Sequence, residues 1–576
     1  MNQNFLKYFT LIFFLVFSFS LKTHAFTRNT DVIFDGMSVE PDKFQETLDT
    51  IKQNKIKNKK ITNPKKLNPD TLFTIKAIQK NPKNIQLEID TSQSVVDTKE
   101  DIQLIISNQG FLNAVTEAIM LWDDVDIADI SFAPVKFTSS IINPDDGKNV
   151  ITFRAAEAPE GAPEGSSVFT VVNTAHTDSV IFMNSLIMAM PGTILDADIV
   201  FDPSNDPCLA FHTTTGPFKI GGDNVPISEG GPNPAVDLSM CDFVGEADLT
   251  DLTVRSIARV LGLASSAIAS SATSAVSQIM TRYALTSDDK IALANLYPNK
   301  EKLTNHGTIT GKVILDKKPI RGVHVVLEDS TTGEPVTSTI TNLTGRFIIK
   351  AIPAGTYNVY AEPVDGPIRK NALRFNFFGS APQLNFTTGL YPTPVTISAN
   401  KKTKISITVK ELSASAFNIN HLTSVLTEKD VNDSGGSFLL PIRIMAGETL
   451  SSVKFWGDNI SKGFGTLSIS GSGITVSNVQ DVNVMISPFF TCKDCDDTPT
   501  ADNPNPKPCK RSPLCALTQE LDQEPDQIVG IQADIKCDPA VAPGPRNIIF
   551  TGDKVDPTHP SFGLRDQITG GIIVTE

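Results

Sequence analysis

Apolar residues early in the chain recur with the spacing of an α-helix. Within residues 112–125, the side chains of Val115, Ala118, Ile119 and Trp122 fall at i, i+3, i+4 and i+7. This spacing places them on one stripe of a helix, with polar residues around the rest of its surface. The pattern therefore predicts an amphipathic helix that covers a hydrophobic core.

Two further segments carry helix signals. Residues 249–263 return to the helical period, and Asp248 or Asp251 can cap the first turn, where the helix dipole favours a carboxylate. A last helix is expected from Ser287, with acidic residues in its first turn and Pro298 just after its end. The buried stripe of the helix at 249–263 is expected to be Val254, Ile257, Ala258 and Leu261.

Short runs between these helices favour β-strands, because they alternate or are apolar and β-branched. Together with the helices they predict a mixed α+β domain over residues 106–300. The runs are "ISFAPVKF" at 130–137, "NVITFRA" at 149–155, "SVFTVVNTA" at 167–175 and "DADIVFDP" at 196–203.

The helical period disappears after about residue 305. Short alternating strands separated by Gly, Pro and Asn turns then fill residues 305–412, and a second such region fills residues 413–576. Both are typical of all-β sandwiches. A Pro/Asp-rich insert at 488–527 interrupts the second region. The fold class predicted is a multidomain chain with an α+β domain and two all-β, immunoglobulin-like sandwiches.

The N-terminus has the pattern of a secretory signal peptide over residues 1–25, with Lys7, an apolar run at 9–21 and a small residue near the end. A retained N-terminal anchor is the alternative. No later run predicts a transmembrane segment. We therefore expect an exported protein that is extracellular, periplasmic or at the cell surface. Residues 26–105 are polar and Lys/Asn-rich, which favours a weakly ordered leader whose removal stays open.

Composition narrows the function classes. The chain has 576 residues, of which 40% are hydrophobic and 20% charged, so it should fold into several domains. A formal net charge of -14 argues against nucleic acid or an anionic membrane as the main partner. A protein or glycan ligand fits better, and the oligomeric state is not fixed by the sequence.

Seven cysteines in an exported chain favour disulfides. A Cys208–Cys241 bridge would stabilise the fold by about 3–4 kcal/mol on the chain-entropy model. The odd total leaves one thiol free or intermolecular. Four cysteines of the insert could also form a zinc knot, but disulfides are the expected state outside the cytoplasm. The cysteines of the C-terminal part, with pairing open, are Cys492, Cys495, Cys509, Cys515 and Cys537.

The segment "VRSIARVLGLASS" can be aligned with the zinc-protease pattern H-E-x-x-H-x-x-G-x-x-H. The glycine of the pattern falls on Gly262. The metal-ligand positions fall on Arg255, Arg259 and Ser265, and the general-base position falls on Ser256.

The surroundings resemble the matrixin-type metzincins in element order over residues 106–300. The resemblance implies a metzincin fold with Gly262 as a scaffold position and Met280 in "SQIM" as the Met-turn. The segments that carry it are "AVTEAIMLWDDV" for the first helix, "DDGKNVITF" for an inner strand, "DADIVFD" for the substrate-pairing edge strand, "VRSIARVLGLASS" for the active-site helix and "LTSDDKIALANLYP" for the terminal helix.

The chemistry of that family cannot follow, because a protonated guanidinium has no lone pair for a metal. Ser256 has no carboxylate to activate water. We therefore predict a degenerate site without zinc and assign no catalytic residue. If a cleft persists, Arg255 and Arg259 could bind an anion, or they could simply pair with nearby carboxylates. Strand addition of a peptide along "DADIVFD" needs no metal.

Other site candidates within residues 106–300 are weak. His176 and His212 are expected to be surface or hydrogen-bonding residues. Acidic residues cluster near the helix at 249–263, and "DPSND" lies at 202–206, so structural calcium stays open although capping and turns explain them more simply. The clustered acids are Asp242, Glu246, Asp248 and Asp251.

The two β regions also resemble known families. "GTITGKV", "PIRGVHVVLED" and "TNLTGRFIIKAIPAGTYNVY" are similar to carboxypeptidase regulatory-like, transthyretin-like domains, with Gly345 and Gly355 in turns. There, Phe347, Tyr357 and Tyr360 could stack on sugar, although alternation favours core packing for two of them. "VKFWGDNISKGFGTLSISGSGITVSNVQ" and "APGPRNIIFTG" resemble IPT/TIG-type immunoglobulin-like domains.

These features favour an exported, non-catalytic pseudo-metalloprotease with a binding, adhesive or structural role. One alternative is an active zinc metalloendopeptidase with an unrecognised site. Another is a glycan-binding surface protein that acts through its sandwiches.

Overall fold

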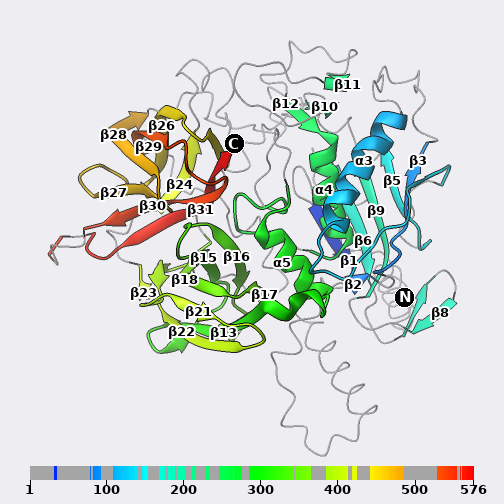
Figure 1. Ribbon diagram of the computed structural model, residues 1–576, viewed down its shortest axis with the longest axis horizontal. Coiled ribbons are helices and arrows are strands. Elements are labelled where there is room, and N and C mark those ends of the chain that lie inside the picture. The colour runs from blue at the N-terminus through cyan, green and yellow to red at the C-terminus, as the bar shows by residue number, and fades with distance from the viewer. Residues whose placement is uncertain are drawn as a thin grey trace, which may run out of the picture.

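The computed structural model divides into a mixed region and two β-sandwiches (Figure 1). Its described residues are 31–35, 78–79, 82–91, 108–140, 146–153, 168–174, 179–182, 185–188, 193–201, 209–214, 227–231, 245–263, 265–274, 284–342, 344–364, 384–412, 418–423, 441–484, 528–553, 558–559 and 561–575.

The first region is built on a seven-stranded sheet of order β1-β6-β9-β5-β3-β4, with β2 paired to β9. Strands β4, β3, β5 and β9 run parallel, and β6 runs antiparallel to β9. The elements are β1 Asp31–Asp35, β2 Ile78–Gln79, β3 Leu87–Asp90, α3 Asn108–Asp123, β4 Lys136–Thr138, β5 Asn149–Phe153, β6 Val168–Thr174, β7 Ser179–Phe182, β8 Ser185–Met188, β9 Thr193–Phe201, β10 Leu209–Thr214, β11 Ile227–Gly231, β12 Gly245–Asp248, α4 Leu249–Val260 and α5 Ser287–Leu296.

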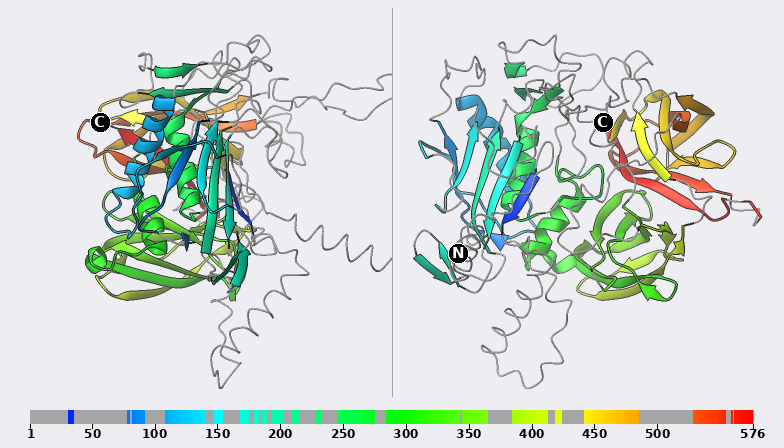
Figure 2. Two further views of the ribbon diagram at one scale, coloured as in Figure 1. Left: turned by 90° about the vertical axis from the view of Figure 1, so that its right-hand side faces the viewer. Right: turned by 180° about the vertical axis from the view of Figure 1, so that it is seen from behind.

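Helices α3 and α4 lie side by side against this sheet (Figures 1 and 2). The predicted stripes of both helices are buried in one core cluster. Trp122 joins the helices directly, because its indole N–H donates to the Val254 carbonyl at 2.9 Å. The ring of Phe111 packs edge-on against Phe201 of the sheet, with centroids 5.6 Å apart. The helical periods predicted from the sequence are confirmed.

Two sequence expectations were wrong in this region. Residues 82–91 are not part of a weakly ordered leader, because Leu87 and Ile89 of β3 belong to the core and β3 pairs with β4 and β5. The segment "DADIVFD" is not an edge strand, because β9 has β5 on one side and β6 on the other. Peptide addition along β9 is therefore blocked by its own neighbours.

The middle sandwich comprises β13 to β23. One sheet holds β17, β13 and β22 with the short β14, and the other holds β16, β15 and β18 with β20 and β21. Its strands are β13 His306–Leu315, β14 Lys318–Pro319, β15 His324–Asp329, β16 Pro335–Ile340, β17 Arg346–Pro353, β18 Gly355–Glu362, β19 Phe386–Thr387, β20 Gly389–Leu390, β21 Val395–Ile397, β22 Lys402–Thr408 and β23 Lys410–Glu411.

The C-terminal sandwich stacks a sheet of order β24-β26-β29-β28 on a sheet of order β25-β31-β30-β27. The apolar residues of both sheets form one core cluster. Its strands are β24 Asn418–Thr423, β25 Ile442–Met445, β26 Thr449–Asp458, β27 Gly465–Ile469, β28 Ile474–Val484, β29 Ile528–Cys537, β30 Gly544–Gly552 and β31 Arg565–Thr575.

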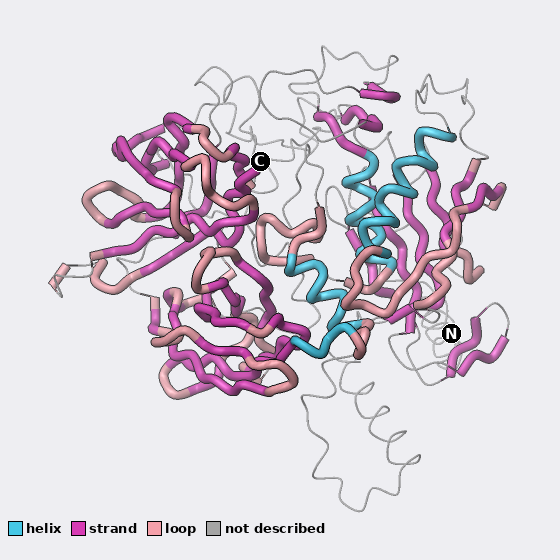
Figure 3. The backbone as a smooth tube through the Cα atoms, in the orientation of Figure 1, coloured by secondary structure: helices cyan, strands magenta, loops and turns pink. Residues whose placement is uncertain are grey.

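Among the described residues, the helices α3, α4 and α5 all belong to the first region, and the remainder is strand and loop apart from a 3-10 helix at Lys302–Asn305 (Figure 3). No helix in that part of the chain is long and apolar enough to cross a bilayer. The three parts touch one another through α5 and through a loop at residues 265–274, which we call the junction loop.

Candidate functional site

Helix α4 contains the segment that we aligned with the zinc-protease pattern, and a side-chain cap fixes the start of this helix. The Asp248 carboxylate accepts hydrogen bonds from the backbone N–H groups of Thr250 and Asp251, at 2.7 and 3.3 Å. This satisfies two donors that a helix start leaves without partners. Capping therefore explains Asp248 without a calcium ion.

The end of α4 is closed by a Schellman turn around Gly262. The Gly262 N–H donates to the Arg259 carbonyl and the Leu263 N–H donates to the Ala258 carbonyl, both at 2.8 Å. Gly262 adopts φ 86°, in the left-handed region that favours glycine. The scaffold role predicted for this glycine has a direct physical reason here.

The remaining carbonyls at this end are bound by side chains from distant segments. The Gln79 amide donates to the Val260 carbonyl at 2.7 Å, and the Tyr297 hydroxyl donates to the Leu261 carbonyl at 2.7 Å. Burial raises the pKa of Tyr297 well above its usual value, so this hydroxyl stays a donor. The end of the helix is therefore built into the interior.

The side chain of Arg259 also stabilises the turn at the end of α4. Its guanidinium donates from Nη1 to the Leu263 carbonyl at 3.0 Å and from Nη2 to Ser265 Oγ at 2.8 Å. The side chain is only 2% exposed. A cation at a helix C-terminus is favoured by the helix dipole. Two positions that the zinc motif reserves for ligands are thus hydrogen-bonded to each other.

The other two motif positions are equally enclosed. Arg255 is 3% exposed and Ser256 is fully buried, and Ser256 Oγ has no hydrogen-bond partner among the described residues. An anion could reach these guanidinium groups only if the surrounding residues moved. The anion-site hypothesis therefore stays a prediction, with no exposed guanidinium to support it.

Several predicted site residues cannot be placed. Met280, the Cys208–Cys241 pair and the cysteines of the insert lie outside the described residues. Cys537 has a free thiol buried in the core of the C-terminal sandwich, and the odd number of cysteines left one thiol free or intermolecular. Burial raises the pKa of this thiol. Within the described chain, no three His, Cys, Asp or Glu side chains are grouped to hold a metal ion.

The junction loop starts at Ser265, and a carboxylate of α5 holds it through hydrogen bonds. The Asp289 carboxylate accepts hydrogen bonds from Ser271 Oγ at 2.6 Å, from the Ala272 N–H at 3.0 Å and from the Thr273 N–H at 3.1 Å. The same carboxylate closes the capping box of α5 with Thr286. One buried carboxylate thus orders both the helix start and the loop.

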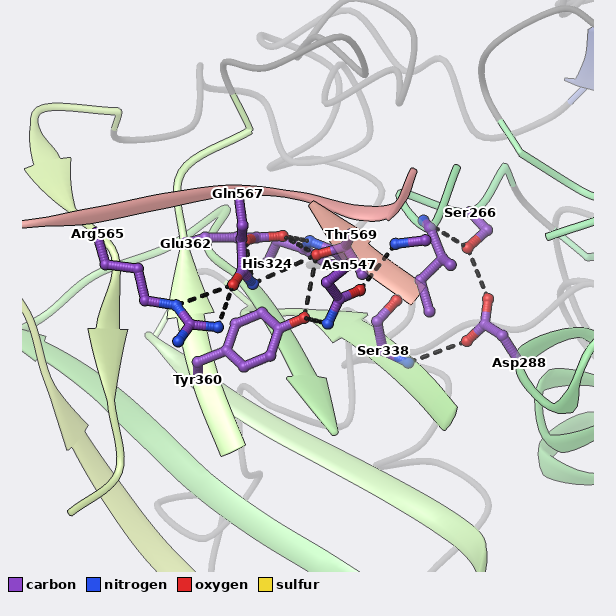
Figure 4. A network of polar contacts seen from close by, with 12 residues as sticks. Ser266, Asp288, His324, Ser338, Tyr360, Glu362, Asn547, Arg565, Gln567 and Thr569 are labelled. Atoms are coloured by element: carbon purple, nitrogen blue, oxygen red, sulfur yellow. Dashed lines mark hydrogen bonds and ion pairs between the residues drawn. The ribbon is translucent and has the colours of Figure 1, made fainter. Parts of the chain in front are cut away.

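Asp288, the neighbouring residue, points to the middle sandwich instead. It accepts hydrogen bonds from Thr337 Oγ1 at 3.0 Å and from the Ser338 N–H at 2.9 Å on β16, and from Ser266 Oγ at 2.6 Å (Figure 4). Burial, and then the charge of Asp289, raise the pKa of Asp288 to about 6. The carboxylate therefore joins the first region, the junction loop and β16.

The junction loop also enters the C-terminal sandwich. Ala269 is fully buried in the core cluster of that sandwich, and its N–H donates to the Thr569 carbonyl at 2.9 Å. Gly570 adopts φ 69°, and a Cβ added there would overlap Ser270 Oγ. The close approach of the loop to β31 therefore requires glycine at position 570.

The two sandwiches meet through a buried polar network centred on Glu362 (Figure 4). Its carboxylate bonds His324 Nδ1 at 2.7 Å, Gln567 Nε2 at 2.9 Å and Thr569 Oγ1 at 2.9 Å. The network thus draws on β15 and β18 of the middle sandwich and on β31 of the C-terminal one. Buried polar groups that satisfy one another in this way fix one geometry.

Tyr360 and Asn547 complete the network. Asn547 Nδ2 donates to Glu328 Oε2 at 2.6 Å and to Tyr360 Oη at 3.1 Å. The Arg565 guanidinium lies 5.7 Å from the centre of the Tyr360 ring. Burial, and then the charges of Glu362 and Glu328, raise the pKa of Tyr360.

The suggestion of sugar stacking by aromatic residues of the middle sandwich was wrong. Phe347, Tyr357 and Tyr360 are 5%, 3% and 0% exposed, so no ring face is open to a ligand. Alternation did predict core packing for two of them. Tyr360 lies on the opposite face of its sheet and is buried only because the C-terminal sandwich covers it.

Sequence reasoning missed this junction. The one available signal was the Ser/Thr/Ala composition of the junction loop, which suits close backbone approach but also suits an ordinary surface loop. Glu328 and Glu362 follow the exposed positions of alternating strands, so their burial could not be anticipated from pattern alone.

Comparison with known families places one part of the chain. Residues 308–410 match the family of carboxypeptidase regulatory-like domains. This confirms the resemblance inferred for the middle sandwich. The metzincin-like assignment of residues 106–300 and the IPT/TIG-type assignment of the C-terminal sandwich stay predictions. No curated protein matches the chain significantly.

Similar solved structures include bacterial pilins. The full-length major pilin SpaD from Corynebacterium diphtheriae is 10% identical over 47% of this chain and 64% of its own, with a TM-score of 0.15. The major pilin subunit BcpA of Bacillus cereus is 9% identical over 47% of this chain and 69% of its own, with a TM-score of 0.14.

A third similar structure is a carbohydrate-binding protein, assigned provisionally, from Bacteroides uniformis, which is 8% identical over 45% of this chain and 94% of its own, with a TM-score of 0.13. The chain spans less than two thirds of SpaD and 46% of a Streptococcus agalactiae minor pilin. Scores this low carry no argument about activity or partners. What the comparisons identify is a carboxypeptidase regulatory-like domain at residues 308–410.

Proposed function

We propose that the chain is an exported, non-catalytic binding or structural protein, in which a metzincin-like region has become a scaffold element. The observation that carries this proposal is the buried Arg259 guanidinium, which bonds Ser265 Oγ at 2.8 Å and the Leu263 carbonyl at 3.0 Å. Arg259 and Ser265 occupy two positions at which the zinc-protease pattern has histidine.

The chemistry of the side chains at the zinc-motif positions supports the proposal. Guanidinium groups offer only N–H donors and stay protonated, so Arg255 and Arg259 would repel a divalent cation. A serine at the general-base position cannot take a proton from water at neutral pH. The enclosed surroundings of all three side chains suit a packing role for α4.

The arrangement of the three parts favours a structural role over an enzymatic one. The first region contributes Ala269 to the core of the C-terminal sandwich and Ile291 to the core of the middle sandwich. Shared cores resist relative motion of the parts. A rigid body of this kind suits a protein that holds or presents a binding surface outside the cell.

Metal analysis and a protease assay on the purified full chain test this proposal. We expect zinc well below one equivalent and no casein cleavage that a chelator abolishes. Stoichiometric zinc together with chelator-sensitive cleavage would establish the metalloendopeptidase alternative instead.

A second measurement tests the structural role of Arg259 itself. Arg259→Ala should lower the free energy of unfolding by about 2–4 kcal/mol, because it removes two charge-assisted hydrogen bonds in a buried turn. Ser265→Ala is the matched control, since it removes one of the two bonds and should cost about 1 kcal/mol. Equal, small losses in both variants would contradict a structural role for the guanidinium.

A further inference from the structure

The outer face of one sheet of the middle sandwich carries cations without any acidic side chain. The strands β17, β13 and β22 lie next to one another, with β13 in the centre. None of the three contains Asp or Glu. Their inward positions fill the core, and their outward positions form what we call the basic face. Its exposed cations are Lys312, Arg346, Lys350, Lys402 and Lys404.

The strand register sets these cations side by side. Lys312 lies directly opposite Arg346 on one neighbour and opposite Ser406 on the other. Thr310 lies between Ile348 and Lys404. Like charges directly opposite one another destabilise a sheet. The pairing of Lys312 with Arg346 therefore gives the sheet no stability of its own, and a bound anion would relieve the repulsion.

Among the described residues, the cationic side chains of this face are exposed. The face lies on the side of the middle sandwich away from the C-terminal sandwich, whereas β15, β16 and β18 lie next to that sandwich (Figure 1). Within the described part of the chain, Lys312, Lys350, Lys402 and Lys404 form no ion pair. The nearest acids along these strands, Asp316 and Glu411, lie beyond the strand ends. A local cationic surface thus stands on a chain with net charge -14.

We propose that the basic face binds a linear polyanion, and specifically an acidic polysaccharide. Cations at alternate positions of a strand repeat about every 6.7 Å, and neighbouring strands lie about 4.8 Å apart, so a chain of anionic groups can meet several at once. Thr308, Thr310, Ser406 and Thr408 place hydroxyl groups between the cations. Hydroxyls both donate and accept hydrogen bonds, as sugar hydroxyls do.

The same observations disfavour other polyanions. Single-stranded nucleic acids bind through aromatic stacking as well as charge. These strands contain no Tyr or Trp, and their one Phe, Phe347, is buried. A planar anionic membrane extends beyond the basic face, so it would also meet acidic side chains past the strand ends, such as Asp316 and Glu411. A narrow polymer can lie on the basic face alone. The proposal does not depend on whether residues 106–300 lack activity.

Binding of the full chain to three polysaccharides of equal length tests the proposal. The probes are polygalacturonate, which carries carboxylates, dextran sulfate, which carries sulfates, and uncharged dextran. We expect binding of at least one anionic polymer that weakens steeply between 50 and 300 mM salt, as counterion release requires, and no binding of dextran. Absence of binding to both anionic polymers at low salt would overturn the proposal.

Charge-neutralising variants locate the site. Lys402→Gln combined with Lys404→Gln should weaken binding about tenfold, since each cation near an anionic surface contributes several-fold to affinity. The matched control is Lys462→Gln combined with Lys536→Gln, two exposed lysines of the C-terminal sandwich, which should leave the affinity unchanged. Equal weakening by both pairs would show that net charge, not the basic face, governs binding.

Two competitor surfaces complete the experiment. Vesicles of phosphatidylserine and phosphatidylcholine, and a duplex DNA of random sequence, should bind more weakly than the polysaccharide at the same salt. Tighter binding of either one through Lys402 and Lys404 would assign the face to a membrane or a nucleic acid and overturn the glycan proposal. The zinc and casein measurements have no bearing on these outcomes, so the two proposals fail separately.

Discussion

The two faces of the middle sandwich use charge in opposite ways. The face of β15 and β18 carries Glu328 and Glu362, and the C-terminal sandwich buries both. The face of β17, β13 and β22 carries cations that remain exposed. One face of this sandwich is therefore an internal surface, whereas the other is exposed.

The difference shows how burial decides what a charged residue costs. A buried carboxylate must be matched by donors, and Glu362 has three. An exposed lysine is solvated and screened, so it needs no partner in the fold. Substitutions on the two faces should therefore differ strongly in their effect on stability.

The largest expected effect is at Glu362. Glu362→Ala leaves His324 Nδ1, Gln567 Nε2 and Thr569 Oγ1 without their acceptor inside the interface, so the free energy of unfolding should fall by about 3–5 kcal/mol in urea denaturation. Lys404→Ala on the basic face is the control and should change it by less than about 0.5 kcal/mol. Similar losses in both variants would remove the distinction between the faces.

Asp288 should make the buried contacts depend on pH. Burial and the charge of Asp289 raise its pKa in the folded protein from the ordinary value of 3.8 to about 6. Its contribution to stability is therefore fully present below about pH 4 and lost as pH rises through about 6, a change of about 3 kcal/mol.

The neutral variant Asp288→Asn isolates this contribution. Relative to the parent chain, its free energy of unfolding should rise as pH increases from 4 to 7, because the variant has no carboxylate to ionise. Urea denaturation at several pH values provides the comparison. A constant difference between the two proteins across this range would contradict the raised pKa.

A smaller effect is expected at Gly570, where the junction loop approaches β31. Gly570→Ala should cost about 2 kcal/mol more than Gly563→Ala in urea denaturation. Both glycines have φ near 70°, so both variants bear backbone strain. Only Gly570 faces Ser270, whereas nothing lies within 4 Å of a Cβ added at Gly563. Equal costs would mean that the loop is not packed against β31.

The smallest expected change in stability is for Lys312→Glu, which should affect stability and binding in opposite directions. Lys312→Glu places opposite charges across β13 and β17, so it should stabilise the fold by a few tenths of a kcal/mol at low salt. The same change should weaken binding of an acidic polysaccharide several-fold. Measuring unfolding and binding on one protein sample shows whether the lysine is retained for a ligand. A loss of stability with unchanged binding would contradict that view.

The local periodicity of apolar residues was sufficient to predict most of the secondary structure. The stripe at Val115, Ala118, Ile119 and Trp122 is buried as predicted, and Asp248 caps α4. Alternating residues also indicated that both regions after residue 305 are built of strands. These features depend on contacts close in sequence, which is why a pattern of period 3.6 or 2 is sufficient.

Long-range partners could not be predicted in the same way. The order β6-β9-β5 places "DADIVFD" in the interior of the sheet, and no property of that segment distinguishes an inner strand from an edge. Strand β31 was not anticipated either, although it provides Gln567 and Thr569 to the junction. At α4, residue chemistry alone argued against zinc at Arg255 and Arg259, but the hydrogen bond between Arg259 and Ser265 could not be predicted from the sequence.

The insertion of Ala269 into the core of the C-terminal sandwich has a practical consequence for proteolysis. A single cut in the polypeptide between the middle and last sandwiches would not release two independent fragments. The nicked pieces would remain associated through non-covalent packing and should co-elute in size-exclusion chromatography until denaturant is added. Intact migration under native conditions would therefore be a poor indicator that the backbone is uncut.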